Sequence, residues 1–232
     1  MYTLYIANKN YSSWSLRPWL LMRALGIPFE ERLVPLEEGS CWDSYRKFSP
    51  NGRVPCLHDG ATVVWDSLAI VEYLAERHAG VWPENAETRA WARSVASEMH
   101  SGFGELRNRC SMNCGLRVQL AQMPDALQAD ISRIDEIWSE GLSRFGGPWL
   151  AGPVFCAADA FYAPVAFRVQ TFDLPLSDTA RSYADRILRH QAMVDWYREG
   201  LAEPWRETSH EAEMRSAGAI VADYREHSAG AG

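Results

Sequence analysis

The pattern of apolar residues changes near residue 80, and this change restricts the fold more than any other feature of the sequence. Before it, short apolar runs with strand-like alternation are separated by turns and short helical segments. After it, apolar residues recur every three or four positions in segment after segment, as in amphipathic helices. We therefore expect a mixed α/β domain over residues 1–79 and an all-helical domain over residues 86–232, joined by a linker at 79–85.

The first half of the N-terminal domain has the pattern of a βαβ unit. Residues 2–7 and 29–34 have the alternation of strands, and residues 18–25 between them have the pattern of a helix ended by Gly26 and Pro28. Because such crossovers are right-handed and join parallel strands, the two strands are expected to pair in parallel.

The second half of this domain has the pattern of a hairpin followed by a helix. Asp59-Gly60, a strong hairpin signal, separates two short apolar runs. A helix over residues 68–77 follows, with Asp66 or Ser67 as its N-cap. Together with the βαβ unit, this predicts a mixed four-stranded sheet, which is the outline of a thioredoxin-like domain. We also expect a short helix over residues 41–48.

Three serines, Ser12, Ser13 and Ser15, occupy the turn between the first strand and the first helix. The amides at a helix start lack internal partners and stabilise a nearby anion such as a thiolate. One of these serines can equally be a simple N-cap. Ser12 and Ser15 have the spacing of a redox C-x-x-C pair, but serines cannot form a disulfide. A hydroxyl here can instead donate a hydrogen bond to a bound thiolate.

The C-terminal half is predicted as a series of helices. One apolar stripe indicates a long helix interrupted by Gly102 and Gly104; it comprises Trp91, Val95, Met99, Phe103 and Leu106. Further helices are expected over residues 124–145, 157–170, 177–189 and 191–200, with Pro164 starting, kinking or ending one of them. Residues from 203 onward turn polar, and the Gly-rich end is expected to fray.

Composition excludes several classes of function. The net charge of −7 argues against nucleic-acid binding, and no basic amphipathic or bilayer-length apolar segment suggests a membrane. We also see no signal peptide. The five scattered cysteines fit reduced thiols in a cytoplasmic protein better than a disulfide framework. Cys110 and Cys114 lack a second ligand pair, so no metal site is expected.

Four motifs, in this order and spacing, resemble those of the cytosolic glutathione transferases, most closely the serine-type zeta and tau branch. The first three are Ser12-Ser13-Trp14-Ser15-Leu16-Arg17, Ser49-Pro50-Asn51-Gly52-Arg53-Val54-Pro55, and the helix start at Asp66-Ser67. The fourth is Phe155-Cys156-Ala157-Ala158-Asp159, similar to the family's S/T-x-x-D capping box with Cys156 in place of the hydroxyl. The resemblance implies a glutathione transferase fold, with glutathione as co-substrate and no metal.

The resemblance also implies where glutathione would lie. Ser12 is the first choice for the hydroxyl that faces the sulfur, with Ser13 and then Tyr11 as alternatives. Arg53 and Val54, with Pro55 in the cis form, would hold the peptide backbone, the last two by strand addition. Asp66 would take the γ-glutamyl ammonium and Ser67 the carboxylate.

The second substrate would be a small electrophile bound between the domains. Its wall is expected to include Tyr11, Trp14, Met99 and Phe103, although the helical spacing of the last two is equally that of core residues. The guanidinium of Arg17 has three possible partners: an anionic co-substrate, the glycyl carboxylate of glutathione, or solvent. His100 is interpreted as a packing or surface residue.

Three functions remain open at this stage. The leading one is conjugation of glutathione to a hydrophobic electrophile. The second is a zeta-like isomerase acting on maleylacetoacetate, or a dehalogenase, although Trp14 stands where the zeta pattern has Cys. The third is a non-catalytic binding module. The resemblance further implies a homodimer.

Overall fold

The computed structural model describes residues 1–225, and its N-terminal part is built on a four-stranded mixed sheet. The strands are β1 (Tyr2–Ile6), β2 (Phe29–Leu33), β3 (Cys56–Asp59) and β4 (Thr62–Val64), in the order β2-β1-β3-β4. β1 pairs in parallel with β2 and antiparallel with β3, and β3 and β4 form the hairpin. The predicted βαβ unit and hairpin are confirmed.

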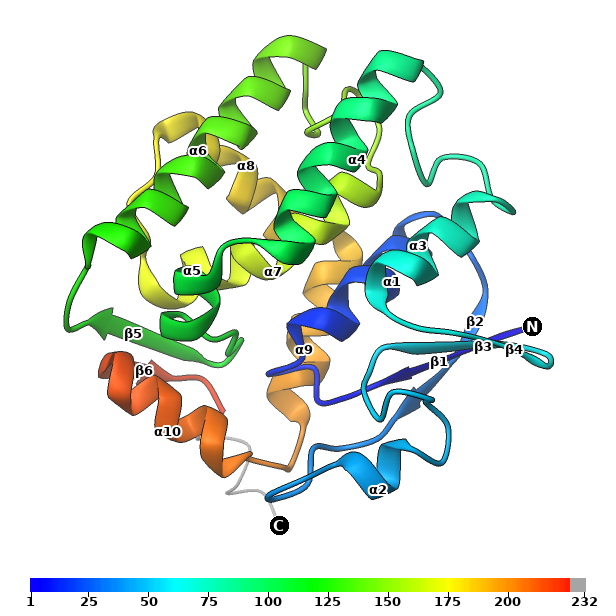
Figure 1. Ribbon diagram of the computed structural model, residues 1–232. Helices are drawn as coiled ribbons and strands as arrows, with labels where there is room; N and C mark the ends of the chain where they lie inside the picture. Colours follow the sequence, from blue (N-terminus) through cyan, green and yellow to red (C-terminus); the bar gives the residue numbers. More distant parts are fainter. Residues whose placement is uncertain (226–232) are drawn as a thin grey trace.

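Three helices accompany this sheet. Figure 1 shows α1 (Ser13–Ala24) and α3 (Ser67–Ala75) on one side of it, and α2 (Trp42–Tyr45) on the other. α1 begins at Ser13, five residues before the helix expected from the sequence, and Pro18 lies inside it. Leu16, Leu20 and Leu21 of α1 are fully buried, so this helix joins the sheet to the helical half.

The C-terminal half is mainly helical and is organised around α7 (Ala157–Phe172). The other helices are α4 (Ala86–Ser101), α5 (Gly104–Arg109), α6 (Asp125–Phe145), α8 (Asp178–Leu188), α9 (Gln191–Ala202) and α10 (Thr208–Ala217). α7 packs against α1, α4 and α8, and every residue of it except Gln170 is buried. The helix continues through Pro164, so this proline lies inside α7 and neither starts nor ends it.

The start of α7 is held by the capping carboxylate expected from the sequence. Asp159 is fully buried and accepts hydrogen bonds of 2.9 Å from the amides of Cys156 and Leu150. The hydroxyl of Tyr183 in α8 donates a third, of 2.7 Å. The carboxylate therefore fixes both the helix start and its contact with α8, although Cys156 has replaced the usual hydroxyl.

The long helix expected across residues 91–106 is interrupted, and that prediction is wrong in this respect. α4 ends at Ser101, the chain turns at Gly102 and Phe103, and α5 starts at Gly104. Phe103 has a left-handed backbone with φ of 60°, which costs a residue with a bulky side chain about 1–3 kcal/mol. The two glycines flanking it are the sequence signal of this break.

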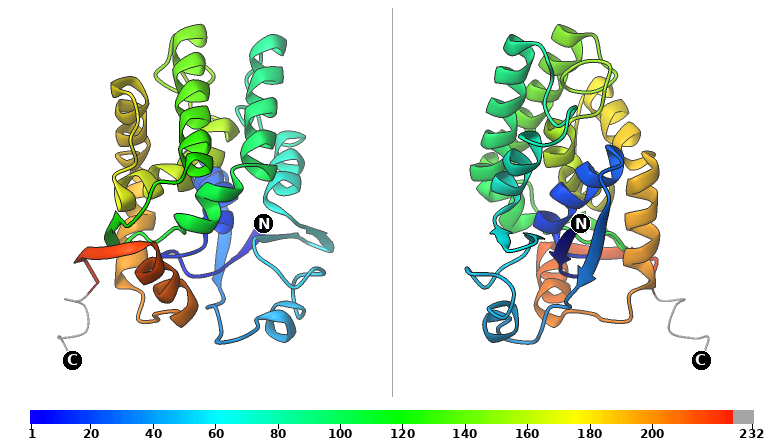
Figure 2. Two further views of the ribbon diagram at one scale, coloured as in Figure 1. Left: turned by 60° about the vertical axis from the view of Figure 1, so that its left-hand side comes forward. Right: turned by 90° about the vertical axis from the view of Figure 1, so that its right-hand side faces the viewer.

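A second sheet, absent from the expected all-helical domain, joins two distant segments. β5 (Leu116–Leu120) pairs antiparallel with β6 (Gly218–Asp223), which follows α10. Figure 2 shows the strand and helix of this C-terminal segment beside the helical half. The polar residues after 203 therefore form a helix and a strand, and the expectation of a frayed end falls on residues outside those described. Within residues 1–225, no helix combines the length and apolarity needed to cross a bilayer.

Candidate functional site

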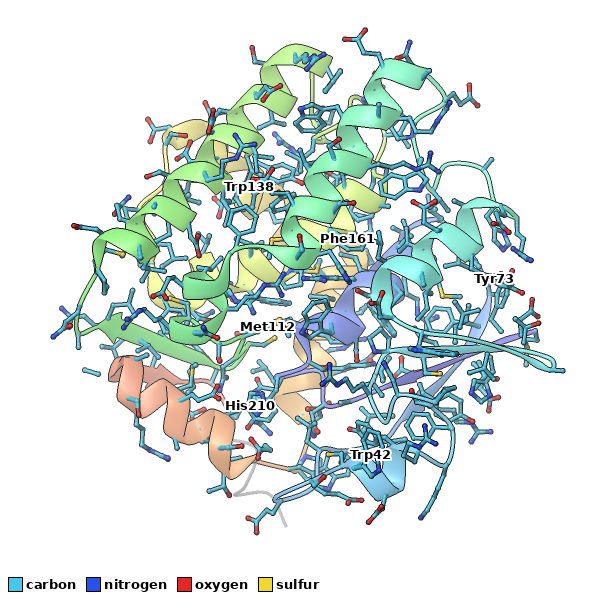
Figure 3. The ribbon with its side chains drawn as sticks, in the orientation of Figure 1. Trp42, Tyr73, Met112, Trp138, Phe161 and His210 are labelled. Carbon is cyan, nitrogen blue, oxygen red and sulfur yellow. The ribbon has the colours of Figure 1, made fainter. Side chains whose placement is uncertain are left out.

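Two adjoining cavities lie where the first strand, the first helix and the helical half meet. The larger, which we call the main cleft, has a volume of about 550 Å³. The smaller, which we call the side cavity, has a volume of about 310 Å³. Both are lined by Trp14, Arg53 and Val54. Figure 3 labels Trp42, Met112 and His210, which surround the main cleft from α2, the α5–β5 loop and α10.

Ser12 and Ser13 both line the main cleft at the start of α1. Ser12 is the N-cap of this helix, and its Oγ accepts a 3.4 Å hydrogen bond from the Ser15 amide. It also donates to the Ser15 hydroxyl at 2.7 Å, which in turn accepts from the Ala7 amide. The capping role considered from the sequence is therefore present, together with exposure of the same side chain to the cleft.

Tyr11 lines the cleft, but its hydroxyl is already engaged elsewhere. It donates a 2.6 Å hydrogen bond to Glu211 of α10 and accepts a 2.9 Å bond from Arg225. Burial, and then the bond to Glu211, raise the pKa of Tyr11 to about 12. A phenol held in this way is a poor source of a proton for a ligand in the cleft.

The side cavity collects the residues expected to hold the glutathione backbone and its γ-glutamyl end. Val54, Pro55 and Asp66 line it, and the Val54–Pro55 peptide bond is cis. Among the described residues, the backbone of Val54 makes no hydrogen bond to another backbone group. It therefore leaves an amide and a carbonyl for an added strand.

Asp66 has two roles in the structure. One carboxylate oxygen caps α3 by accepting hydrogen bonds from the amides of Leu68 and Ala69. The other lies 3.4 Å from Nε2 of His100, which also lines the side cavity. Ser67, the first residue of α3, is fully buried and its hydroxyl faces Arg17 at 3.5 Å.

Trp14 is the aromatic wall shared by the two cavities. The guanidinium of Arg17 lies 4.1 Å from its ring centre and that of Arg107 lies 4.8 Å away. His100 meets the ring edge-on at 5.3 Å. Arg17 is only 1% exposed, which excludes the solvent-facing alternative for this residue.

The other two expected wall residues lie in the core. Met99 is fully buried and Phe103 is 7% exposed, and neither is among the described residues lining the main cleft. The cleft instead takes Arg107 from α5 and Arg168 from α7. Sequence reasoning missed both arginines. The signal was present for Arg168, the one basic residue in a largely apolar helical segment. No group of three or more possible metal ligands occurs in the part of the chain that the structure describes.

Comparison with known proteins identifies a matching family and similar folds. Residues 11–77 match the family described as glutathione S-transferase, N-terminal domain. Glutathione S-transferase 1 of Dianthus caryophyllus is 26% identical over 202 residues, covering 81% of this chain and 87% of the relative.

Two solved structures have the same fold. A glutathione transferase homologue from Burkholderia strain BGR1, with bound glutathione, has a TM-score of 0.64 at 23% identity, covering 86% of this chain and 97% of the other. A maleylacetoacetate isomerase from Methylobacterium extorquens AM1, with bound malonate and glutathione, has a TM-score of 0.64 at 20% identity, covering 87% and 98%. Residues 11–77 therefore match the N-terminal domain of the glutathione S-transferase family, and the four-stranded N-terminal sheet and helical C-terminal half have the fold of glutathione transferases.

Proposed function

We propose that the protein binds glutathione across the side cavity and the main cleft, ionises its thiol, and transfers the thiolate to a small electrophile. The observation that carries this proposal is the placement of Ser12 and Ser13 in the same cleft that Val54 lines. Val54 continues into the side cavity, where Pro55 and Asp66 lie. Glutathione extended through both cavities can therefore place its cysteinyl sulfur beside the hydroxyl of Ser12 or Ser13.

The γ-glutamyl end and the cysteinyl residue of glutathione have suitable partners in this arrangement. The carboxylate of Asp66 is half exposed in the side cavity and can accept the γ-glutamyl ammonium. The amide of Ser67 is proposed for the γ-glutamyl carboxylate, because the next two amides of α3, those of Leu68 and Ala69, already donate to Asp66. Val54 pairs with the cysteinyl residue as an added strand, and Arg53 lies alongside.

Ser12 is proposed as the group that holds the thiolate, with Ser13 as the alternative. Rotation of the two hydroxyls lets Ser15 donate to Ser12, which frees the Ser12 proton for the sulfur. A hydrogen bond to a charged partner is worth about 1.5–3 kcal/mol, or about one to two pKa units of the thiol. The thiol proton leaves to solvent when glutathione ionises, and neither serine is consumed.

The test is conjugation of glutathione to an aryl chloride, with Ser12→Ala and Ser13→Ala as variants. In this reaction a carbon–sulfur bond forms, the carbon–chlorine bond breaks and chloride leaves. We expect at least one of the variants to lose about tenfold or more in kcat/KM, corresponding to about 1.4 kcal/mol. Equal rates in all three proteins remove the serines from the mechanism. Failure of the wild type to bind glutathione at millimolar concentration favours the non-catalytic binding module.

A glutathione-dependent isomerase or dehalogenase is the second candidate. It is supported by the shared fold of the maleylacetoacetate isomerase described above. Activity on maleylacetoacetate or a haloacid, with little conjugation of aryl chlorides, would select it. Trp14 stands where the zeta pattern has a cysteine, so any isomerisation here would have to proceed without that thiol.

Two further properties belong to the same proposal. The five cysteines are unpaired in the structure, which supports a reducing, cytoplasmic setting. The family resemblance supports a homodimer, and sedimentation of the purified protein measures its mass directly.

A further inference from the structure

Three arginines from three helices gather at the main cleft. Arg17 comes from α1, Arg107 from α5 and Arg168 from α7. Arg17 and Arg168 are 1% and 3% exposed, and Arg107 is half-buried. Arg107 and Arg168 line the main cleft together with Ser12 and Ser13, and Arg17 reaches the same place through the ring of Trp14.

None of these three charges is paired directly with a carboxylate of the described chain. Within residues 1–225, no carboxylate forms an ion pair with any of them. Their partners are carbonyl oxygens, aromatic faces and, for Arg17, the hydroxyl of Ser67. Arg107 donates to the carbonyls of Met99, His100 and Gly102. Removing a charge from water is costly unless the charge gains a counter-charge. The three guanidinium groups can therefore still attract an anion.

In the part of the chain that the structure describes, Arg168 and Arg17 likewise have no carboxylate as a hydrogen-bond partner. Arg168 donates to the carbonyls of Cys110 and Pro164, at 2.7 and 3.2 Å. The Nε atom of Arg17 is buried without a hydrogen-bond partner among the described residues. Burial first, and mutual repulsion second, lower the pKa of Arg17, and of Arg168 to about 10. An anion in the cleft would relieve this repulsion.

One carboxylate does line the main cleft, and it does not pair with the cluster. Glu213 of α10 is exposed and accepts a 2.6 Å hydrogen bond from the hydroxyl of Ser111. Asp66 lies in the side cavity and Asp130 contacts the backbone amide of Leu106 at 3.0 Å. Burial lowers the pKa of Arg17 and of Arg107; Asp66 opposes this for Arg17, and Asp130 for Arg107, without forming an ion pair with either arginine. The three guanidinium groups are therefore only partly compensated, and positive charge remains in excess at the serine end of the cleft.

We propose that the second substrate carries a carboxylate or a similar anionic group, which Arg107 and Arg168 bind while Ser12 or Ser13 holds the sulfur. Arg17 reinforces the positive charge from behind Trp14. A guanidinium offers a planar fork of donors that matches a carboxylate, which explains arginine rather than lysine at these positions. This inference rests on the proposed function, and it replaces a purely hydrophobic electrophile by an acidic one.

The experiment compares a chlorodinitrobenzoate with its carboxamide, which has nearly the same shape and reacts by the same displacement of chloride. Wild-type protein is expected to favour the benzoate by about tenfold or more in kcat/KM. In Arg107→Gln this ratio should collapse toward one, and Arg107→Lys should restore part of it. Arg109→Gln is the matched control, because Arg109 lies on the same helix, is half exposed and pairs with Glu105.

Binding measured without chemistry covers the case in which a variant folds poorly or neither compound reacts. Calorimetry with S-methylglutathione present compares unreactive dinitrobenzoate with dinitrobenzamide on wild-type protein. Tighter binding of the benzoate supports the proposal, and equal affinity overturns it. If Arg107→Gln weakens glutathione itself and leaves the benzoate-to-carboxamide ratio unchanged, the arginines serve the glycyl carboxylate and the proposal is overturned. Conjugation of both compounds at equal rates overturns the inference and leaves the proposed transferase function intact.

Discussion

The hydroxyl of Tyr11 donates a 2.6 Å hydrogen bond to Glu211, two hundred residues further along the chain. This bond ties the turn before the first helix to α10. Arg225 reaches the same hydroxyl from the end of the described chain, and Glu203 accepts hydrogen bonds from the backbone of Lys9 and Asn10. The C-terminal segment therefore fixes the turn that carries the serines.

Tyr11→Phe tests whether this tyrosine is structural. We expect a loss of about 1–3 kcal/mol in the free energy of unfolding, because buried Glu211 would lose its shortest hydrogen bond and keep only the longer ones from Asn113 and Arg206. Glutathione conjugation should fall by less than about threefold, since the hydrogen bonds lost, to Glu211, Arg225 and Glu207, are directed away from the proposed reacting groups. Denaturant unfolding measures the change in stability, and steady-state kinetics measure the change in conjugation rate. A large loss of kcat without a loss of stability would instead place Tyr11 among the reacting groups.

Asp66 is expected to combine capping with ligand binding, and two substitutions separate these roles. Asp66→Asn retains a side chain that caps helices well, so stability should change little while glutathione affinity falls. Asp66→Ala should lose affinity and also about 1 kcal/mol of stability. Thermal unfolding and calorimetric titration measure both properties. Unchanged affinity in Asp66→Asn would rule out the ammonium contact.

His100 is expected to make the protein less stable in mild acid. Burial lowers the pKa of His100 below its usual 6.5; nearby Asp66 opposes this, while Arg17 and Arg107 add to it. The unfolded chain therefore binds the proton more readily, and stability falls as the pH drops below about 6.5. His100→Gln should reduce this slope. The free energy of unfolding of His100→Gln and of wild type, measured across this pH range, detects the difference in slope. Parallel curves for the two proteins would refute the role of His100 in the pH dependence.

Gly141 allows α6 to approach the loop after it. A Cβ at this position would lie 2.7 Å from the carbonyl oxygen of Leu150 and 2.5 Å from the ring of Trp91. Gly141→Ala should therefore destabilise the protein by about 1–3 kcal/mol, despite the better helix propensity of alanine. Ser143→Ala, at an exposed position of the same helix, is the control and should change stability by less than about 0.5 kcal/mol. Similar melting temperatures for both variants would contradict the packing.

The sequence predicted the N-terminal domain well because its signals are local. Alternation, the Asp59-Gly60 turn and the cap at Asp66 each lie within a few residues of the element they specify. The break after Ser101 was missed because apolar spacing continues across it, while the left-handed backbone of Phe103 changes its direction. β5 and β6 are separated by about a hundred residues in the sequence, and no local pattern specifies that two such distant strands will pair.

The same distinction applies to the site. The serines, Val54 and Asp66 belong to short motifs and could be named from the sequence. Arg107 and Arg168 meet only because α5 and α7 pack near one another, so their joint charge becomes visible only in three dimensions.

The most direct measurement of the central claim is the thiol pKa of glutathione bound to the protein. Ultraviolet absorbance of the thiolate, followed against pH, gives this value for wild type, Ser12→Ala and Ser13→Ala. Our account predicts a bound pKa below that of free glutathione, raised by about one to two units in the variant that removes the contacting hydroxyl. The Tyr11→Phe value should match wild type. The same thiol pKa in wild type and in both serine variants would contradict the account.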